Sequence, residues 1–230
     1  TETEVCHVAK FAEEHKLLSF KNVILFECAP ASDQSDIDVD FAVQTAEVFC
    51  KKYANTCFIL SSPRSFKGVS AQIIDASTLS FRENAELTKY CTLLIGCSSG
   101  ITWLATSDWA KKLPTVQVLN KNLKIYAGVA FDHNIWGLNN RNVIEISDNK
   151  KKQLLAILAV IFETSFFKAK KKYHANFKPK LSTNKWLIFS ENKKPYQLFR
   201  NIMSNYNHYS FLTRVLFVLF CYIILPFDRL

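Results

Sequence analysis

The chain has 230 residues, of which 49% are hydrophobic and 21% are charged, and it holds only five Gly and six Pro. This is enough apolar material for one ample core or two small ones, and it excludes low-complexity disorder, collagen and mucin-like stalks. Lys and Arg outnumber Asp and Glu by 29 to 20, so the chain as a whole is basic.

The basic excess is confined to the last third of the chain. Residues 1–149 hold 14 basic and 17 acidic side chains, whereas residues 150–230 hold 15 basic and 3 acidic ones. A local positive field attracts polyanions such as phosphate-rich membranes or nucleic acid. We therefore predict an α/β domain over residues 1–149 and a basic, partly apolar helical extension over residues 150–230.

The chain has seven cysteines, without a CxxC pair or the spaced Cys/His quartet of a zinc site. Most lie in apolar runs, where a free thiol behaves as a small hydrophobic group, which favours a reducing compartment. The stretch from Thr1 to His15 is polar and acidic, unlike a signal peptide, so we expect a cytoplasmic location. A chain that begins with Thr rather than Met fits a processed product or a domain of something longer.

Short apolar runs alternate with amphipathic stretches through the first two-thirds of the chain. Apolar side chains at helical spacing predict an amphipathic helix over residues 4–18. Short continuous apolar runs are typical of strands covered on both faces in a parallel sheet. In chain order, the pattern predicts strands over residues 22–26, 56–60, 71–74, 92–95 and 114–119, and helices over residues 36–53, 80–90 and 101–112. One more short element is expected between Trp136 and Ile146.

Strand and helix thus alternate about five times, in runs too short to cross a bilayer. Such alternation predicts a doubly wound α/β fold with a parallel, Rossmann-like sheet. In an open parallel sheet, ligands bind outside the carboxyl ends of the strands. Polar loops are expected at three such ends, over residues 31–35, 61–62 and 96–100.

The loop from Gly96 to Gly100 is the most informative, because a helix is expected to begin within or directly after it. Unpaired N–H groups at the helix start and the hydroxyls of Ser98 and Ser99 would form an anion site suited to a diphosphate. Gly100 would let a phosphate approach the backbone. An ordinary N-cap and a tight turn explain the same residues. The loop matches neither a P-loop, nor GxGxxG, nor the elbow of a serine hydrolase.

Three segments together resemble the donor-binding half of GT-B glycosyltransferases, in particular the heptosyltransferase-like families of bacterial surface polysaccharide synthesis. They are residues 83–105 with the Gly-Cys-Ser-Ser-Gly turn, residues 112–116 with Pro114-Thr-Val116, and residues 23–32 with the first strand and loop. The resemblance covers about residues 20–120. It departs from the family at Cys97-Ser98, where an Asp is common.

The resemblance implies a nucleotide-sugar donor, a polysaccharide or lipid-linked acceptor, and no required metal or other cofactor. The residues that it would place around the donor are Ala31, Ser32, Gln34, Ser61, Asp75, Leu79, Glu83, Ser98, Ser99, Gly100 and Thr102. Glu83 is equally explained as a helix cap, because it follows Ser80 at the spacing of a capping box. The family's catalytic base comes from an amino-terminal lobe, so we expect another lobe or a partner chain to complete the enzyme.

Two further functions remain open at this stage. One is a sugar-nucleotide epimerase that shares the two-lobed fold. The other is a membrane-associated partner subunit that keeps a nucleotide-binding fold without activity, since fold alone does not decide function.

Isolated titratable residues are weaker candidates. The five histidines are scattered, and a lone His is usually structural or solvated. Asp132-His133 is the most suggestive pair, in a segment expected to be a loop after the last strand. Asp36, Asp38 and Asp40 alternate as in a cation site, but the first turn of a helix explains them better.

The basic third contains two apolar stretches, both shorter than the roughly 20 residues of a membrane span. Residues 154–167, flanked by lysines, predict a helix buried against the sheet. Residues 211–227 suit either an interfacial or re-entrant helix or a core helix that docks on another lobe. With Lys clusters and Trp186 nearby, peripheral contact with the inner face of the membrane is expected. No RNA- or DNA-binding motif is present, so nucleic acid is a weak candidate.

Overall fold

The computed structural model describes residues 1–28, 30, 35–66, 70–120, 128–146 and 150–175. Its centre is a sheet of six parallel strands in the order β3-β2-β1-β4-β5-β6. The strands are β1 (Asn22–Glu27), β2 (Thr56–Ser61), β3 (Ile73–Asp75), β4 (Leu93–Gly96), β5 (Thr115–Val118) and β6 (Val143–Ile146). The doubly wound α/β fold is therefore confirmed, and its strand order is that of a Rossmann-like sheet.

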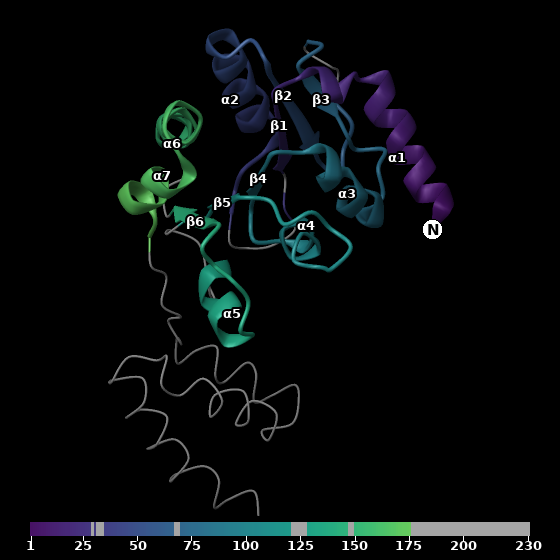
Figure 1. The fold of residues 1–230 in the computed structure, drawn as a ribbon. Helices are drawn as coiled ribbons and strands as arrows, with labels where there is room; N and C mark the ends of the chain where they lie inside the picture. The colour runs from purple at the N-terminus through teal and green to yellow at the C-terminus, as the bar shows by residue number, and fades with distance from the viewer. Residues whose placement is uncertain (29, 31–34, 67–69, 121–127, 147–149, 176–230) are drawn as a thin grey trace, which may run out of the picture.

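Helices cover both faces of the sheet (Figure 1). One face, called the α2 face below, is covered by α2 (Val39–Lys52), α6 (Lys151–Glu163) and α7 (Phe166–Tyr173). The other, called the α3 face, is covered by α1 (Glu2–Glu14), α3 (Phe81–Leu87), α4 (Gly100–Leu104) and α5 (Val129–Ile135). Short 3-10 turns lie at Leu17–Ser19 and Thr88–Tyr90.

Alternate residues of each strand enter two separate cores. In β1, Ile24 and Phe26 join the core under the α2 face, whereas Val23 and Leu25 join the core under the α3 face. This is the two-residue period of a strand covered on both sides. It explains why the strands appear in the sequence as continuous apolar runs rather than as an alternating pattern.

Two of the elements expected in the first two-thirds of the chain are wrong in extent or type. The helix expected over residues 101–112 ends at Leu104, because side chains take the backbone carbonyls that a longer helix would use. The Thr106 hydroxyl donates to the Trp103 carbonyl, and Lys112 Nζ donates to the Thr106 and Ser107 carbonyls. The segment around Asp132-His133 is not a loop after the last strand. It is α5, which precedes β6.

The described part of the basic third packs on the sheet. Leu154, Ile157 and Leu158 of α6 are fully buried in the core of the α2 face, as expected. The helix expected over residues 154–167 is wrong in extent, because α6 ends at Glu163 and the Ser165 hydroxyl caps a separate helix, α7, by accepting the Lys168 N–H. Glu163 at the end of α6 accepts hydrogen bonds from Lys52 Nζ at 2.8 Å and Tyr53 Oη at 2.5 Å, which ties α6 to α2. The stretches expected at residues 178–194 and 211–227 lie outside the described residues. No helix among those described reaches the length and apolarity of a membrane span.

Candidate functional site

The strand order reverses between β1 and β4, which are neighbours in the sheet but about 70 residues apart in the chain. From β1 the chain proceeds outward through β2 and β3, and it then returns to place β4 on the other side of β1. At such a reversal the loops that follow the two strands diverge and leave a crevice, where doubly wound folds bind ligands. The turn that follows β4, residues 97–99, therefore lies where the sequence predicted the site.

A row of side chains crosses the sheet at its carboxyl edge. Strand register places Ser61, Glu27, Gly96, Gln117 and Glu145 side by side on five adjacent strands, β2, β1, β4, β5 and β6. We call this set the polar row. Its polar side chains are almost completely buried, and it lies on the α3 face beneath the starts of α4 and α5. Buried polar groups need hydrogen-bond partners, and the loops above the row supply them.

Glu27 is the acceptor that holds the turn after β4. Its Oε2 atom accepts hydrogen bonds from the Cys97 N–H at 2.8 Å and from the Thr102 hydroxyl at 2.9 Å. Its Oε1 atom accepts a hydrogen bond from the Ser99 hydroxyl. The hydroxyls of Ser99 and Thr102 thus point at a carboxylate of the protein itself. Ser99 occupies the N-cap position of α4 without making the usual side-chain cap bond.

Gln117 holds the middle of the same turn. Its Oε1 atom accepts the Ser98 N–H at 2.9 Å, and its Nε2 atom donates to the Thr102 hydroxyl at 3.1 Å. The Ser98 N–H is therefore already used within the protein. Ser98 also has a φ of +56°, in the left-handed region that non-glycine residues seldom adopt. Such a conformation costs roughly 1–3 kcal/mol and persists only where its surroundings impose it, which is common at ligand sites.

Two glycines give this cluster its close packing. A Cβ on Gly96 would lie 2.5 Å from Gln117 Nε2 and would collide with the Thr102 hydroxyl, so only glycine allows these two side chains to meet over β4. A Cβ on Gly100 would collide with the ring of Phe81, which covers the backbone at the start of α4. The space that the sequence assigned to a phosphate above Gly100 is occupied by this ring.

Glu145, at the other end of the polar row, holds the start of α5. Its Oε1 atom accepts the Ala130 N–H at 2.9 Å, and its carboxylate fills the space where Gly128 lacks a side chain. Burial raises the pKa of Glu145 to about 7, although the hydrogen bonds from the Ala130 and Val129 backbone act in the opposite direction. A second acidic group on α5, Asp132, has its pKa raised by burial to about 6.

The other predicted site residues that the structure describes, Ser61, Asp75, Leu79 and Glu83, lie at four separate places. Ala31, Ser32 and Gln34 lie outside the described residues. Ser61 is buried at the end of β2, and its carbonyl accepts the Cys28 N–H at 2.9 Å. Leu79 is buried in the core of the α3 face.

Asp75, at the end of β3, anchors two backbone segments. Its carboxylate accepts the Ser77 N–H at 2.8 Å, the Phe66 N–H at 3.1 Å and the Ser65 hydroxyl at 2.8 Å. Burial alone would raise its pKa, but these hydrogen bonds outweigh burial and hold the pKa of Asp75 below its usual range. The carboxylate therefore remains charged and fixed at the carboxyl edge of the sheet.

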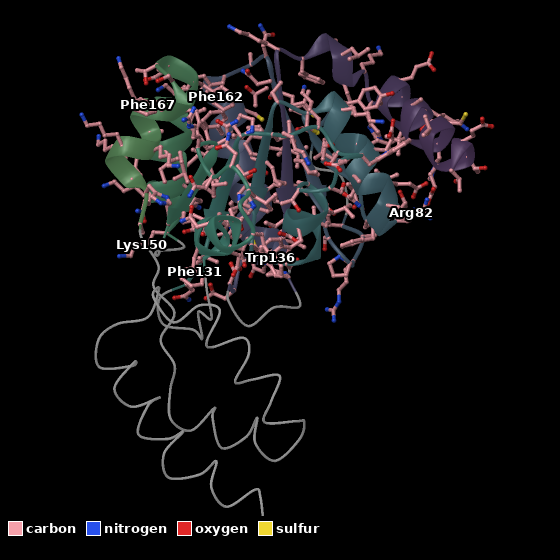
Figure 2. The ribbon with its side chains drawn as sticks, turned by 60° about the horizontal axis from the view of Figure 1, so that its bottom comes forward. Arg82, Phe131, Trp136, Lys150, Phe162 and Phe167 are labelled. Atoms are coloured by element: carbon pink, nitrogen blue, oxygen red, sulfur yellow. The ribbon has the colours of Figure 1, made fainter. Side chains whose placement is uncertain are left out.

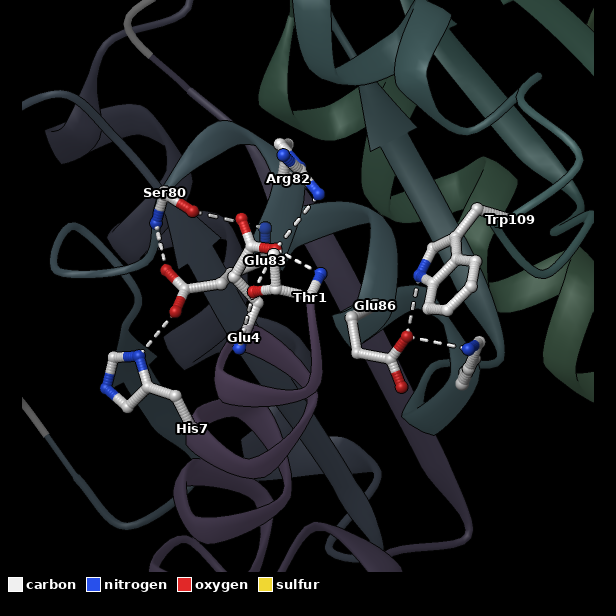
Figure 3. Close-up of polar contacts among 9 residues, drawn as sticks. Thr1, Glu4, His7, Ser80, Arg82, Glu83, Glu86 and Trp109 are labelled. Atoms are coloured by element: carbon white, nitrogen blue, oxygen red, sulfur yellow. Dashed lines mark hydrogen bonds and ion pairs between the residues drawn. The ribbon is translucent and has the colours of Figure 1, made fainter.

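Glu83 lies between α3 and α1 (Figure 3). Its Oε2 atom accepts the Ser80 N–H at 2.6 Å, and the Ser80 hydroxyl accepts the Glu83 N–H, which completes a capping box. Its Oε1 atom lies 2.5 Å from His7 Nδ1. Burial would raise the pKa of Glu83, but the hydrogen bonds from His7 and Ser80 outweigh it and lower the pKa. The explanation of Glu83 as a cap of α3 is therefore confirmed.

An open cavity of about 500 Å³ lies between the segment that follows β2 and the start of α2. It is bounded by the start of α2, with Asp38 and Asp40, and by residues 62–66, which include the exposed Arg64. Asp38 caps α2, because its Oδ1 atom accepts the Phe41 N–H at 2.7 Å. Asp38 and Asp40 thus lie at the start of a helix, as expected, whereas Asp36 precedes the helix and accepts a hydrogen bond from Asn120 Nδ2 at 2.9 Å. No group of metal-ligating side chains gathers among the described residues.

Sequence reasoning missed the three residues that organise the site. They are Glu27, Gln117 and Glu145, each of which interrupts or ends an apolar strand run. A charged or amide side chain inside a buried strand is the signal that could have found them, because such a side chain must have a partner.

The six cysteines among the described residues are free thiols, and burial raises the pKa of Cys28 and Cys57 to about 12.

No protein family, curated protein or solved structure matches this chain.

Proposed function

We propose that this chain supplies the donor-binding half of a GT-B-type glycosyltransferase, which transfers a sugar from a nucleotide-sugar to a polysaccharide or lipid-linked acceptor. The observation that carries the proposal is the reversal of strand order between β1 and β4, with the strained Ser98 turn after β4 and the open cavity of about 500 Å³ beside the segment after β2. A nucleoside diphosphate would lie along this edge. Its leaving charge would be stabilised by backbone N–H groups of this edge other than those of Cys97 and Ser98, which Glu27 and Gln117 hold. The catalytic base would come from another lobe or chain.

Glu27 makes the proposal testable, because its carboxylate lies directly behind the turn. An anion bound about 6 Å away would feel a repulsion of about 3 kcal/mol per unit charge at an effective dielectric constant of ~20. A diphosphate at this turn should therefore bind tenfold or more tightly to Glu27→Gln than to the unmodified chain. Glu145→Gln is the matched control: it changes a buried carboxylate of the same polar row, three strands away, or about 14 Å at the usual strand spacing.

The experiment is calorimetry of the intact chain and both variants with UDP, GDP, ADP, CDP and dTDP. We expect at least one nucleotide to bind, with affinity raised by Glu27→Gln and nearly unchanged by Glu145→Gln. Absence of binding by all five nucleotides would remove the proposal, as would an equal response of the two variants. A positive result is followed by measuring nucleoside diphosphate release from the matching nucleotide-sugar with candidate acceptors.

A second function is favoured by the internal hydrogen bonds of the turn. The Ser98 N–H and the hydroxyls of Ser99 and Thr102 all bond to side chains of the protein, as they would in a partner subunit that keeps the fold without binding a donor. We propose peripheral membrane contact under either function. Phe167 is 75% exposed on α7 beside exposed lysines, and Figure 2 shows it on the opposite side of the molecule from Arg82. Salt-sensitive vesicle binding without nucleotide binding would support the partner subunit.

A further inference from the structure

Large apolar side chains face solvent where α5 ends. Trp136, at the end of α5, is 74% exposed, and Leu138, in the turn that follows, is 41% exposed. Figure 2 shows Trp136 and Phe131 along the same edge of the molecule, and Phe131 is partly exposed as well. A single exposed apolar residue needs no explanation, but neighbouring ones commonly mark a contact surface.

A hollow of about 210 Å³ lies beside Leu138, between α4 and α5. Apolar side chains and threonines form most of its wall, in which Leu113, Val129 and Val143 join Leu138. A dry cavity of about 150 Å³ holds one benzene ring, so the hollow has room for one Phe or Leu side chain. We call Trp136, Leu138 and the hollow the α5 surface. It combines projecting apolar side chains with a recess for another, which suits an apolar partner segment.

The described part of the chain ends beside the α5 surface. Ala175, its last residue, donates its backbone N–H to the Glu145 carbonyl at 2.7 Å, and the Glu145 side chain holds the start of α5. Lys170 of α7 donates to the Asn140 carbonyl at 2.7 Å, two residues after Leu138. The end of α7 is therefore tied to the strand and to the turn that border the α5 surface.

The sequence beyond Ala175 contains an apolar stretch that can reach this surface. Residues 211–227 end in a run, residues 215–227, that holds no charged side chain. The 35 residues between Ala175 and this stretch span about 115 Å when fully extended. A domain of the size of residues 1–175 has a radius of gyration of only about 16 Å. The length of the connection therefore allows residues 211–227 to return to α5.

We propose that residues 211–227 of the same chain cover the α5 surface, with one of their Phe or Leu side chains in the hollow. One contact then removes two apolar surfaces from water, and a segment tethered beside its target acts at a high effective concentration. The proposal does not rest on the proposed function. It also leaves the basic surface of α7 free, because Figure 2 shows Phe167 well apart from Trp136.

The first test is photocrosslinking of the full chain in lipid-free buffer, with p-benzoyl-phenylalanine in place of Trp136. Trypsin cleaves after Arg214 and Arg229, so mass spectrometry identifies a crosslink to the peptide 215–229. We expect this crosslink in roughly tenfold excess over the same probe in place of Leu18, which is 84% exposed in the 3-10 turn before β1. Equal yields from the two positions would overturn the proposal.

Mixing ¹⁵N-labelled and unlabelled chains before irradiation separates contact within one chain from contact between two. We expect each crosslinked pair to be wholly labelled or wholly unlabelled. Pairs that join a labelled to an unlabelled peptide in the statistical ratio would assign the contact to a second copy and would overturn the proposal.

A matched pair of variants asks whether the α5 surface holds the segment. Trp136→Asp places a charge on this surface, so chymotrypsin should cut within residues 211–227 roughly tenfold faster than in the unmodified chain. Leu18→Asp is the control and should leave the cleavage rate unchanged. Both positions are exposed, and circular dichroism should show both variants folded as the unmodified chain is. Unchanged cleavage in the folded Trp136→Asp variant, or an equal rise in Leu18→Asp, would overturn the proposal.

Discussion

Replacing Glu27 by Leu should destabilise the folded chain by about 4 kcal/mol. Leu has a similar volume and suits the neighbouring core, so the change mainly removes the acceptor. The Cys97 N–H and the Thr102 hydroxyl, both buried, lose their carboxylate partner, at roughly 1–3 kcal/mol each. The Ser99 hydroxyl is only partly buried and should add less, because it can turn to water.

Glu27→Gln separates the loss of charge from the loss of the acceptor. Its side-chain oxygen can still accept from Cys97 and Thr102, while its NH₂ group can donate to Ser99, so we expect a loss below about 1.5 kcal/mol. Glu13→Leu, at an exposed position on α1, is the control and should stay within about 0.5 kcal/mol.

Urea unfolding followed by Trp fluorescence and far-ultraviolet circular dichroism measures all three variants against the unmodified chain. The slope of the free energy of unfolding against urea should be unchanged, because the same surface is exposed on unfolding. If Glu27→Leu lies within 1 kcal/mol of the unmodified chain, the Glu27 carboxylate does not hold the turn after β4.

Three further outcomes follow from other parts of the structure. Gly96→Ala should destabilise by several kcal/mol and should be partly rescued by Thr102→Ala, which removes the hydroxyl that the new Cβ would meet; equal losses in the single and double variants would contradict the packing described for β4. The pKa of Glu145 rises from 4.5 to about 7 on folding, so the free energy of unfolding should fall by about 3 kcal/mol as the pH rises from about 4.5 to 7, at 1.4 kcal/mol per pKa unit. In Glu145→Gln, urea unfolding at each pH should show a free energy of unfolding that depends less on pH. Phe167→Ser should weaken sedimentation with phosphatidylserine vesicles, whereas Leu18→Ser, at an equally exposed apolar residue before β1, should not; binding that is unchanged in high salt or on neutral vesicles would refute peripheral attachment.

The sheet could be predicted from the sequence because each strand is a short run of residues buried on both faces. The apolar runs of β1 and β2 can be recognised without knowing which strands pair with them. The ends of the helices were harder to predict. α4 stops early because Thr106 and Lys112 bond to backbone carbonyls, a competition that apolar spacing does not reveal. α5 was missed because its start is held by Glu145, which comes after it in the chain.

The position of the candidate site could be predicted, but its internal chemistry could not. The turn after β4 follows from the local Gly-rich sequence. Its contact with Glu27 depends on β1 and β4 being neighbours in the sheet, and its contact with Gln117 depends on strand register. These are facts about pairing across the sheet. No local pattern contains them, so the Ser98 N–H looked free in the sequence.

The shared hydroxyl of Thr102 couples Glu27 to Gln117, so these positions should change together in variants. It donates to Glu27 and accepts from Gln117, which in turn accepts the Ser98 N–H, so a change at one position alters what its neighbours need. Double-mutant cycles among these residues should be strongly non-additive. Related sequences should therefore replace these residues together rather than singly. New loops grafted onto this edge of the sheet have to keep Glu27, Thr102 and Gln117 together.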